Sequence, residues 1–112
     1  MLSPFPSPRG VHRAARFIDG HLEDPLTIGL VAAAAGMAGR TLHKHFRSRG
    51  TSPMRYVRER RFGEVRQALL GAAPDESVTG IALRWGFSHL GRFAVEYRKR
   101  YGETPSQTLR RR

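Results

Sequence analysis

Three basic side chains, Arg40, His43 and Lys44, stand three and four residues apart in this sequence. Residues at that spacing share one face of a helix, so a helix here would carry all three on one side. Leu42 and Phe46 are also four residues apart and would form an apolar stripe on another side. Arg and Lys are charged hydrogen-bond donors, which suits them to anionic groups. The segment therefore predicts a helix with one buried side and one cationic side.

The charge of the chain is concentrated in its later part. Lys and Arg number 20 against 9 acidic residues, which gives a net charge of +11. Residues 1–39 are balanced, whereas residues 40–112 hold 17 basic residues against 6 acidic ones. Basic charge gathered in one portion of a domain is the expected footprint of a polyanionic partner. Because 18 of the 20 cations are Arg, a bias that genome base composition also produces, charge alone makes nucleic acid a candidate only.

The residue pattern gives little support to metal or enzyme chemistry. The chain has no Cys, which excludes disulfides and thiolate metal ligands. His43 and His45 are two residues apart on the predicted helix and point to different sides, so they do not form a metal-binding pair. The acidic residues are scattered, and no glycine-rich phosphate loop is present. We expect neither an enzyme nor a cofactor.

The location of the protein is inferred by elimination. No apolar run approaches the roughly 20 residues that a membrane-spanning helix needs. Residues 1–10 lack the charged start and the apolar stretch of a secretory signal, and the absence of Cys gives no sign of an oxidising compartment. We expect a soluble cytoplasmic protein with no membrane partner.

Helix signals run from about residue 10 to the end of the chain. Residues 1–9 are predicted to be a tail or linker, because prolines at positions 4, 6 and 8 disfavour regular structure. Hydroxyl side chains predict helix N-caps at Thr27, Ser52, Ser77 and Thr104. No segment shows the alternation of a strand. The predicted fold class is all-α, with about seven helices.

Apolar residues at helical spacing are expected to form the core. They are Val11, Ala15, Ile18 and Leu22 on a first helix, Met54, Val57, Phe62, Val65 and Leu69 on a longer one, and Val78, Ile81 and Trp85 on a later one. Trp85 is predicted to be a core anchor. Arg61 and Arg66 are expected to pair with Glu59 and Glu64, and the final three arginines are expected to form a mobile basic tail.

A pattern of short helix, glycine, turn and second helix occurs twice. Ala32, Gly36, Leu42, Phe46, Gly50 and Pro53 are matched by Ala82, Gly86, Phe93, Tyr97, Gly102 and Pro105, at an offset that grows from 50 to 52. One copy is typical of any helical hairpin. Two copies with basic second helices favour paired helix-turn-helix units, in which the second helix enters the major groove of DNA.

The repeat predicts a division of the chain into subdomains. The first helix-turn-helix subdomain is expected at residues 10–51, a linker helix at 52–73 and the second subdomain at 74–112. From residue 52 to residue 70 the linker would span about 28 Å at about 1.5 Å per residue. That length approaches the roughly 34 Å of one DNA turn, so both units could face the same side of a duplex.

Two segments resemble the AraC/XylS family of transcription regulators. Residues 32–46, followed by Gly50-Thr-Ser-Pro53, are similar to the first helix-turn-helix of that family. Residues 78–93, followed by Tyr97 and by Gly102-Glu-Thr-Pro105, resemble the second one, which is the signature region of the family. The resemblance covers about residues 10–110. It implies seven helices in two subdomains, with reading helices in adjacent major grooves of double-stranded DNA.

The resemblance also implies roles for individual side chains. Arg40, His43 and Lys44 fall on the base-reading positions of the first recognition helix. Contacts to the DNA backbone are expected from Thr41, Arg47, Arg55, His89, Arg92, Arg98 and Lys99. On the second recognition helix the base-reading positions fall on Leu90, Gly91, Ala94 and Val95, whose side chains donate no hydrogen bond. We therefore expect the second unit to contact mainly the phosphate backbone of the DNA. Apolar contact of these residues with a thymine methyl group is the alternative.

Two other functions are compatible with the same residues. A non-specific architectural DNA-binding protein would show a steep salt dependence and almost no sequence preference. A helical protein-interaction module with an acidic partner would be competed by heparin but not by duplex DNA. For a sequence-specific regulator, located at the nucleoid, RNA polymerase and an upstream effector-binding domain are further candidate partners.

Overall fold

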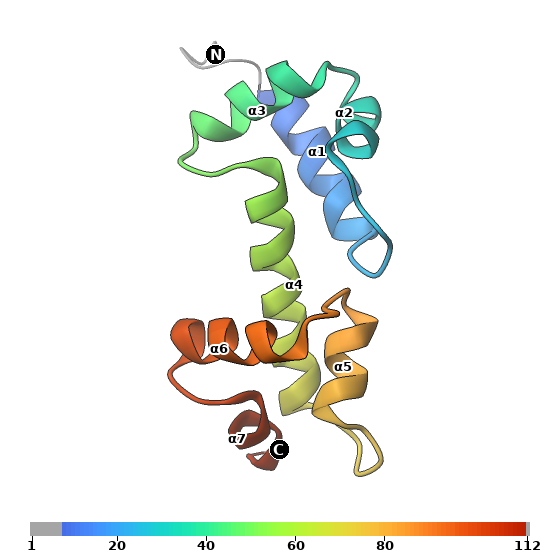
Figure 1. Cartoon of the computed structure of the whole chain (residues 1–112). Coiled ribbons are helices and arrows are strands. Elements are labelled where there is room, and N and C mark those ends of the chain that lie inside the picture. The colour runs from blue at the N-terminus through green and yellow to red at the C-terminus, as the bar shows by residue number, and fades with distance from the viewer. Residues whose placement is uncertain (1–7, 112) are drawn as a thin grey trace. The chain divides into compact units, whose positions relative to one another are not determined.

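The computed structural model describes residues 8–111, and within that range it contains helices and no strand. The helices are α1 (Pro8–Gly20), α2 (Ile28–Ala35), α3 (Gly39–Arg47), α4 (Pro53–Leu70), α5 (Val78–Arg84), α6 (Leu90–Tyr101) and α7 (Pro105–Arg110) (Figure 1). The predicted all-α class is confirmed. The predicted tail falls on residues 1–7, which lie outside the described range, and on Pro8 and Arg9, where α1 begins.

The helices form two compact units, divided between Arg60 and Arg61 within α4. The first unit contains α1, α2, α3 and the first part of α4. The second contains the rest of α4 together with α5, α6 and α7. Each unit thus combines one short-helix hairpin with part of the longest helix.

The first unit buries a mostly aliphatic set of side chains, with α1 lying beside α2 (Figure 1). The set is Ala14, Ile18, Leu22, Leu26, Val31, Ala32, Ala35, Leu42, Phe46 and Val57. Of the stripe predicted on the first helix, Ile18 and Leu22 are buried, whereas Val11 and Ala15 are half-buried. The helix α1 ends at Gly20, so Leu22 is buried from the loop after α1 and is not part of the helical stripe.

Polar contacts also hold α1 in the first unit. The Arg13 guanidinium donates from Nε and Nη2 to the Ala35 carbonyl, at 3.2 and 3.0 Å, and so satisfies a free carbonyl at the end of α2. Asp19 accepts from Arg60 Nε at 2.9 Å and from the Tyr56 hydroxyl at 3.3 Å. Burial and the neighbouring Asp19 carboxylate raise the pKa of Tyr56. These contacts join α1 to α2 and to the first part of α4.

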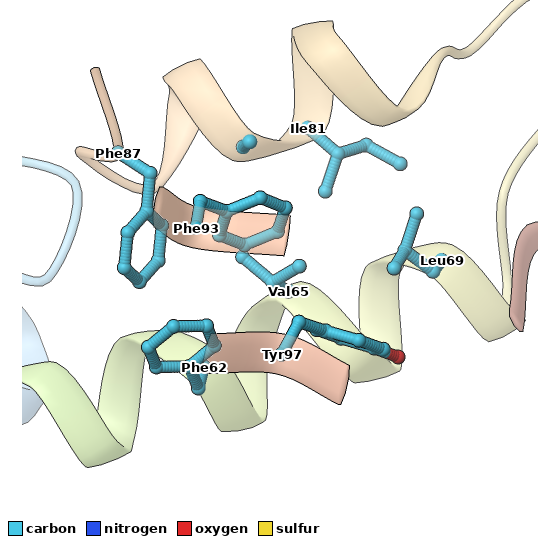
Figure 2. Packing of buried hydrophobic residues seen from close by; sticks show 8 residues of the cluster. Phe62, Val65, Leu69, Ile81, Phe87, Phe93 and Tyr97 are labelled. Carbon is cyan, nitrogen blue, oxygen red and sulfur yellow. The ribbon is translucent and has the colours of Figure 1, made fainter. Parts of the chain in front are cut away.

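The second unit has an aromatic core (Figure 2). Phe62 of α4 is stacked on Phe93 of α6, with 5.6 Å between ring centroids. Phe87, in the turn between α5 and α6, lies 4.5 Å from Phe62 and 4.9 Å from Phe93. Val65, Leu69, Ile81, Ala82 and Tyr97 complete the buried cluster.

The prediction that Trp85 anchors this core needs correction. Trp85 follows the end of α5, is half-buried and packs against the cluster without being part of its interior. Its indole Nε1 is buried with no hydrogen-bond partner among the described residues. Phe87, two residues later, is 5% exposed and takes the interior position. The turn after α5 thus directs the later aromatic residue inward.

A chain of hydrogen bonds fixes α7 in the second unit. Arg66 Nη1 donates to the Tyr97 hydroxyl at 3.3 Å, and this hydroxyl donates to Thr108 Oγ1 at 2.8 Å. The Thr108 hydroxyl donates in turn to Glu103, which also accepts from Arg111 Nη1 at 2.8 Å. The Thr108 hydroxyl is the first cause, and Arg111 a further one, of a pKa for Glu103 below its ordinary value.

The same contacts correct two expectations about arginines. Arg66 lies 3.7 Å from Glu103 Oε2, a partner far away in the sequence. Of the final three arginines, Arg110 ends α7 and Arg111 is held by Glu103, while Arg112 lies outside the described residues. Arg61 lies against Gly86, since a Cβ on Gly86 would come 3.2 Å from its guanidinium carbon.

The glycines of the predicted repeat occupy equivalent turns in the two units. Gly36, Gly50, Gly86 and Gly102 have φ values of 71°, 76°, 92° and 75°. This left-handed region is open to glycine and strained for most other residues. After the first helix of each hairpin the chain closes with the same backbone bond, from Met37 to Ala32 at 3.0 Å and from Phe87 to Ala82 at 2.9 Å. The two hairpins are therefore structural repeats.

The predicted helix starts are also confirmed. Thr27 accepts from the Leu30 amide at 3.1 Å, Ser77 from the Gly80 amide at 3.0 Å, and Ser52 from the Arg55 amide at 3.2 Å. Thr104 and Gln107 form a reciprocal capping box with Pro105 in the first turn of α7. Each bond satisfies an amide that the helix itself leaves free.

Candidate nucleic-acid interface

The first candidate recognition helix, α3, has a clear division between a buried and an exposed side. Leu42 is fully buried and Phe46 is 2% exposed, and these two side chains fix the helix in the core of the first unit. At about 100° per residue, Arg40 and Lys44 lie on the opposite side. Both are exposed. The side chains predicted to read bases are thus free to meet a ligand.

The other predicted side chains of α3 are exposed as well. Thr41 and His43 lie at the two borders of the face that carries Arg40 and Lys44, and Arg47 is the last residue of the helix. His45 points to a different side, is half-buried, and has an Nδ1 atom without a partner among the described residues. The structure therefore places His43 and His45 in different surroundings, as their spacing predicts.

Arg55 lies in the first turn of α4. Pro53 is buried and begins this helix, and Ser52 accepts the Arg55 amide. The Arg55 side chain is exposed. A cation at the start of a helix, beside free amide groups, is well placed for a phosphate.

The second candidate recognition helix, α6, has the same division. Phe93 is 2% exposed and Tyr97 is fully buried in the aromatic core. His89 immediately precedes the helix as its N-cap and is exposed. The remaining predicted backbone contacts on this helix are also exposed: Arg92, Arg98 and Lys99.

The four positions of α6 that lack hydrogen-bond donors do not share one environment. Leu90 packs against the aromatic core and is half-buried, as is Ala94. Gly91 is exposed with open space around it, and Val95 is 58% exposed. Leu90 therefore serves the packing of α6, and the exposed pair is Gly91 and Val95.

Two structural contributors were missed by reasoning from the sequence. Phe87 enters the core at the position that matches Met37 in the first repeat, and the repeat offset of 50 could have indicated it. Arg13 caps the end of α2 across 22 residues of sequence, and no local pattern predicts such a contact.

Within residues 8–111 no helix is both long enough and apolar enough to cross a membrane. In the same range no three His, Asp or Glu side chains are grouped as a metal site would require.

Comparison with known proteins agrees with this geometry. The family model described as "Helix-turn-helix domain" matches residues 31–111. The chain is 42% identical over 113 residues to a probable thc operon regulatory protein of Rhodococcus erythropolis, covering 98% of this chain and 34% of that protein. It is 40% identical over 100 residues to the XylDLEGF operon transcriptional activator of Pseudomonas putida, covering 88% of this chain and 31% of that protein. The chain thus spans about a third of the length of these curated relatives.

A solved structure covers nearly the whole chain. The crystal structure of a probable AraC family transcriptional regulator from Rhodopseudomonas palustris superposes with a TM-score of 0.83 at 40% sequence identity. The match includes 91% of this chain and 95% of that one. Together with the paired hairpins and their exposed basic helices, this places the chain in the AraC family of transcriptional regulators, as a helix-turn-helix DNA-binding domain.

Proposed function

We propose that this domain binds double-stranded DNA at specific sequences and regulates transcription, with α3 and α6 each lying in a major groove. The observation that carries the proposal is the pair of equivalent helices, each fixed by two buried apolar side chains and each exposing cations on the other side. The major groove is about 12 Å wide and admits one helix. Such a helix turns its exposed face toward the base edges.

In this proposal α3 is the helix that reads bases by hydrogen bonds. Arg40, His43 and Lys44 lie in the first six residues of α3, and the N-terminal residues of a recognition helix are those that contact base edges. Arg can donate two hydrogen bonds to O6 and N7 of guanine, and Lys can donate to the same acceptors. Thr41, Arg47 and Arg55 would contact phosphates along the rim of the groove.

The second unit contributes mainly contacts to the DNA backbone. His89, Arg92, Arg98 and Lys99 are exposed along α6, and cations near phosphates supply affinity that depends on salt but not on sequence. This division of labour explains how two similar units would serve one binding site. The first would specify the sequence and the second would mainly hold the duplex.

Sequence-specific binding is favoured over architectural binding by the relatives. The two curated relatives described above are named for particular operons, which an architectural protein would not be. The name of the P. putida protein calls it an activator, and we propose activation for this chain too. Cytoplasmic location at the nucleoid and the lack of enzymatic activity belong to the same proposal. RNA polymerase and an upstream effector-binding domain stay predictions.

Selection of bound sequences from random duplex DNA at physiological salt tests this function. We expect enrichment of one or two short sequence segments, about 10 base pairs apart if both units read, and at least about a 10³-fold preference over random DNA. A steep salt dependence without any enriched sequence would support the architectural alternative. Competition by heparin, with no competition by duplex DNA, would instead support an acidic protein partner.

A further inference from the structure

The exposed face of α6 has an apolar side chain at its centre. Phe93 and Tyr97 point into the aromatic core. At about 100° per residue, Val95 lies on the opposite side of the helix from both of them. Its side chain is 58% exposed, the largest exposed fraction among the large hydrophobic residues of the described chain. The other exposed large hydrophobic residues of the described chain, Leu83 and Leu30, are 53% and 50% exposed and lie on α5 and α2, outside the candidate recognition helices.

Cations border Val95 on both sides. On the helix surface Arg98 lies on one side of Val95, and Arg92 and Lys99 lie on the other. All three are exposed. When such a helix lies in a groove of DNA, its centre faces the base edges and its borders face the two phosphate strands. The arrangement on α6 therefore offers cations to phosphate and an apolar group to the bases.

Gly91 extends this apolar centre. It precedes Val95 by one helical turn and has no atom within 4 Å of the position that a Cβ would take. A glycine at this point brings nothing but backbone to the surface and lets the helix approach a groove closely. Neither Gly91 nor Val95 has a side-chain donor or acceptor. Gly91 and Val95 themselves therefore offer no hydrogen-bond readout by side chains.

The major groove offers one apolar group that such a face can recognise. Base edges there present hydrogen-bond donors and acceptors, except for the C5-methyl group of thymine. An aliphatic side chain against a donor or acceptor leaves that polar group without a partner, which costs free energy. Against a methyl group it removes apolar surface from water. An exposed aliphatic side chain in this groove therefore distinguishes base edges by the presence or absence of a methyl group.

We propose that Val95 is a specificity-determining residue that recognises the C5-methyl group of a pyrimidine in the major groove occupied by α6. This inference rests on the proposed function, because it requires that α6 lies in a groove. It assigns the second unit a reading role of its own, beyond contacts to the backbone. The same methyl group is present on 5-methylcytosine, so cytosine methylation at this position would strengthen binding.

The test replaces single thymines of the selected site by deoxyuridine, which removes the methyl group and keeps every hydrogen-bonding group. We expect one replacement in the segment contacted by the second unit to weaken binding about three- to fivefold, the effect of one buried methyl group. Replacing that thymine by cytosine and then by 5-methylcytosine should lower the affinity and then restore part of it. Uniform affinity across all these duplexes would overturn the proposal.

A double-mutant cycle assigns the effect to Val95. Val95→Ala should weaken binding to the thymine duplex and have no effect on the deoxyuridine duplex, because both changes remove the same contact. Leu83→Ala is the matched control, since Leu83 is 53% exposed on α5 and lies outside this face. It should keep the full difference between thymine and deoxyuridine. Independent effects of Val95→Ala and deoxyuridine would contradict the inference.

The outcomes separate this inference from the proposed function. Specific binding of a selected site, without any effect of thymine methyl groups in the second segment, would overturn the role of Val95 and leave the function intact. Failure to select any site would overturn the function and the inference with it. Because Val95 is exposed, its truncation to Ala leaves the core unchanged, and each variant serves as its own folding control on the deoxyuridine duplex.

Discussion

The two candidate recognition helices, α3 and α6, each have two buried apolar residues four positions apart, and they differ at the centre of their exposed faces. Leu42 and Phe46 fix α3 in the same way as Phe93 and Tyr97 fix α6, at an offset of 51 residues. At that offset Arg40 corresponds to Gly91 and Lys44 to Val95. The buried residues that fix the two helices are therefore alike, whereas the exposed residues at equivalent positions differ in charge and hydrogen-bonding capacity.

The cores behind these helices differ as well. Within residues 8–60 the first unit buries mostly aliphatic side chains and one enclosed ring, Phe46, which meets Tyr56 edge-on at 5.9 Å. The second unit is built on a cluster of four aromatic rings. Glycines with positive φ and hydroxyl N-caps recur in both units, so the hairpin geometry depends on these residues more than on the kind of side chain that fills the core.

The largest expected effect concerns the aromatic core. Phe93→Ala should destabilise the second unit by about 3–5 kcal/mol, because it removes a ring packed between Phe62, Phe87 and Tyr97 and leaves a cavity. Urea unfolding followed by NMR signals of each unit measures it. Trp85→Ala should cost clearly less, since Trp85 is half-buried. Equal losses for the two variants would contradict the assignment of Phe93 to the interior.

The next prediction compares base reading with backbone contact. Arg40→Ala or Lys44→Ala should cost about 1–3 kcal/mol of binding free energy and relax the sequence preference at one position. Arg92→Ala should weaken binding to all sequences alike and reduce the dependence on salt. Binding curves on a set of operator variants at several salt concentrations distinguish the two. If the Arg40 and Arg92 variants lose affinity in the same way across that set, the assignment of base reading to α3 and backbone contact to α6 is wrong.

A smaller effect is expected at the start of α3. Ala38 is the N-cap residue, with extended backbone angles of φ −71° and ψ 153°, and its side chain offers no cap hydrogen bond. Ala38→Ser should stabilise the first unit by about 1 kcal/mol, as Thr27 and Ser77 do for α2 and α5. Thermal unfolding measures the gain, and the sequence preference should not change. A loss of stability would show that the Ala38 side chain has a packing role.

The smallest expected effect depends on pH and belongs to the second unit. The hydroxyl of Thr108 and the cations Arg111 and Arg66 lower the pKa of Glu103 below its ordinary value of 4.5. Because the folded pKa is the lower one, the carboxylate contributes its full stabilisation above pH 4.5 and loses it as the pH falls through the folded value.

Glu103→Gln removes this contribution. Wild type should therefore melt at a higher temperature than the variant near neutral pH, and the difference should shrink below pH 4.5. Melting temperatures of both proteins between acidic and neutral pH measure it. A difference that stays constant over the whole range would mean that the carboxylate charge has no part in holding α7.

Much of the fold could be predicted from local patterns. Thr27, Ser77 and Thr104 cap helices within three residues of themselves, and a glycine closes a turn through its own backbone angles. The exposed cations of α3 and α6 follow from helical spacing once Leu42, Phe46, Phe93 and Tyr97 are assigned to the core. Their roles toward DNA stay predictions, because a role depends on a partner as well as on exposure.

The sequence by itself thus determined the class of fold, the helix starts, the repeated turns and the basic faces, since each depends on residues a few positions apart. Only the tertiary structure decided that Phe87 enters the core while Trp85 stays at its margin. It also decided that Arg13 caps α2, that Tyr97 and Thr108 connect Arg66 to Glu103, and that Val95 is left exposed. Such contacts join residues distant in sequence, and they exist only where packing brings particular side chains together.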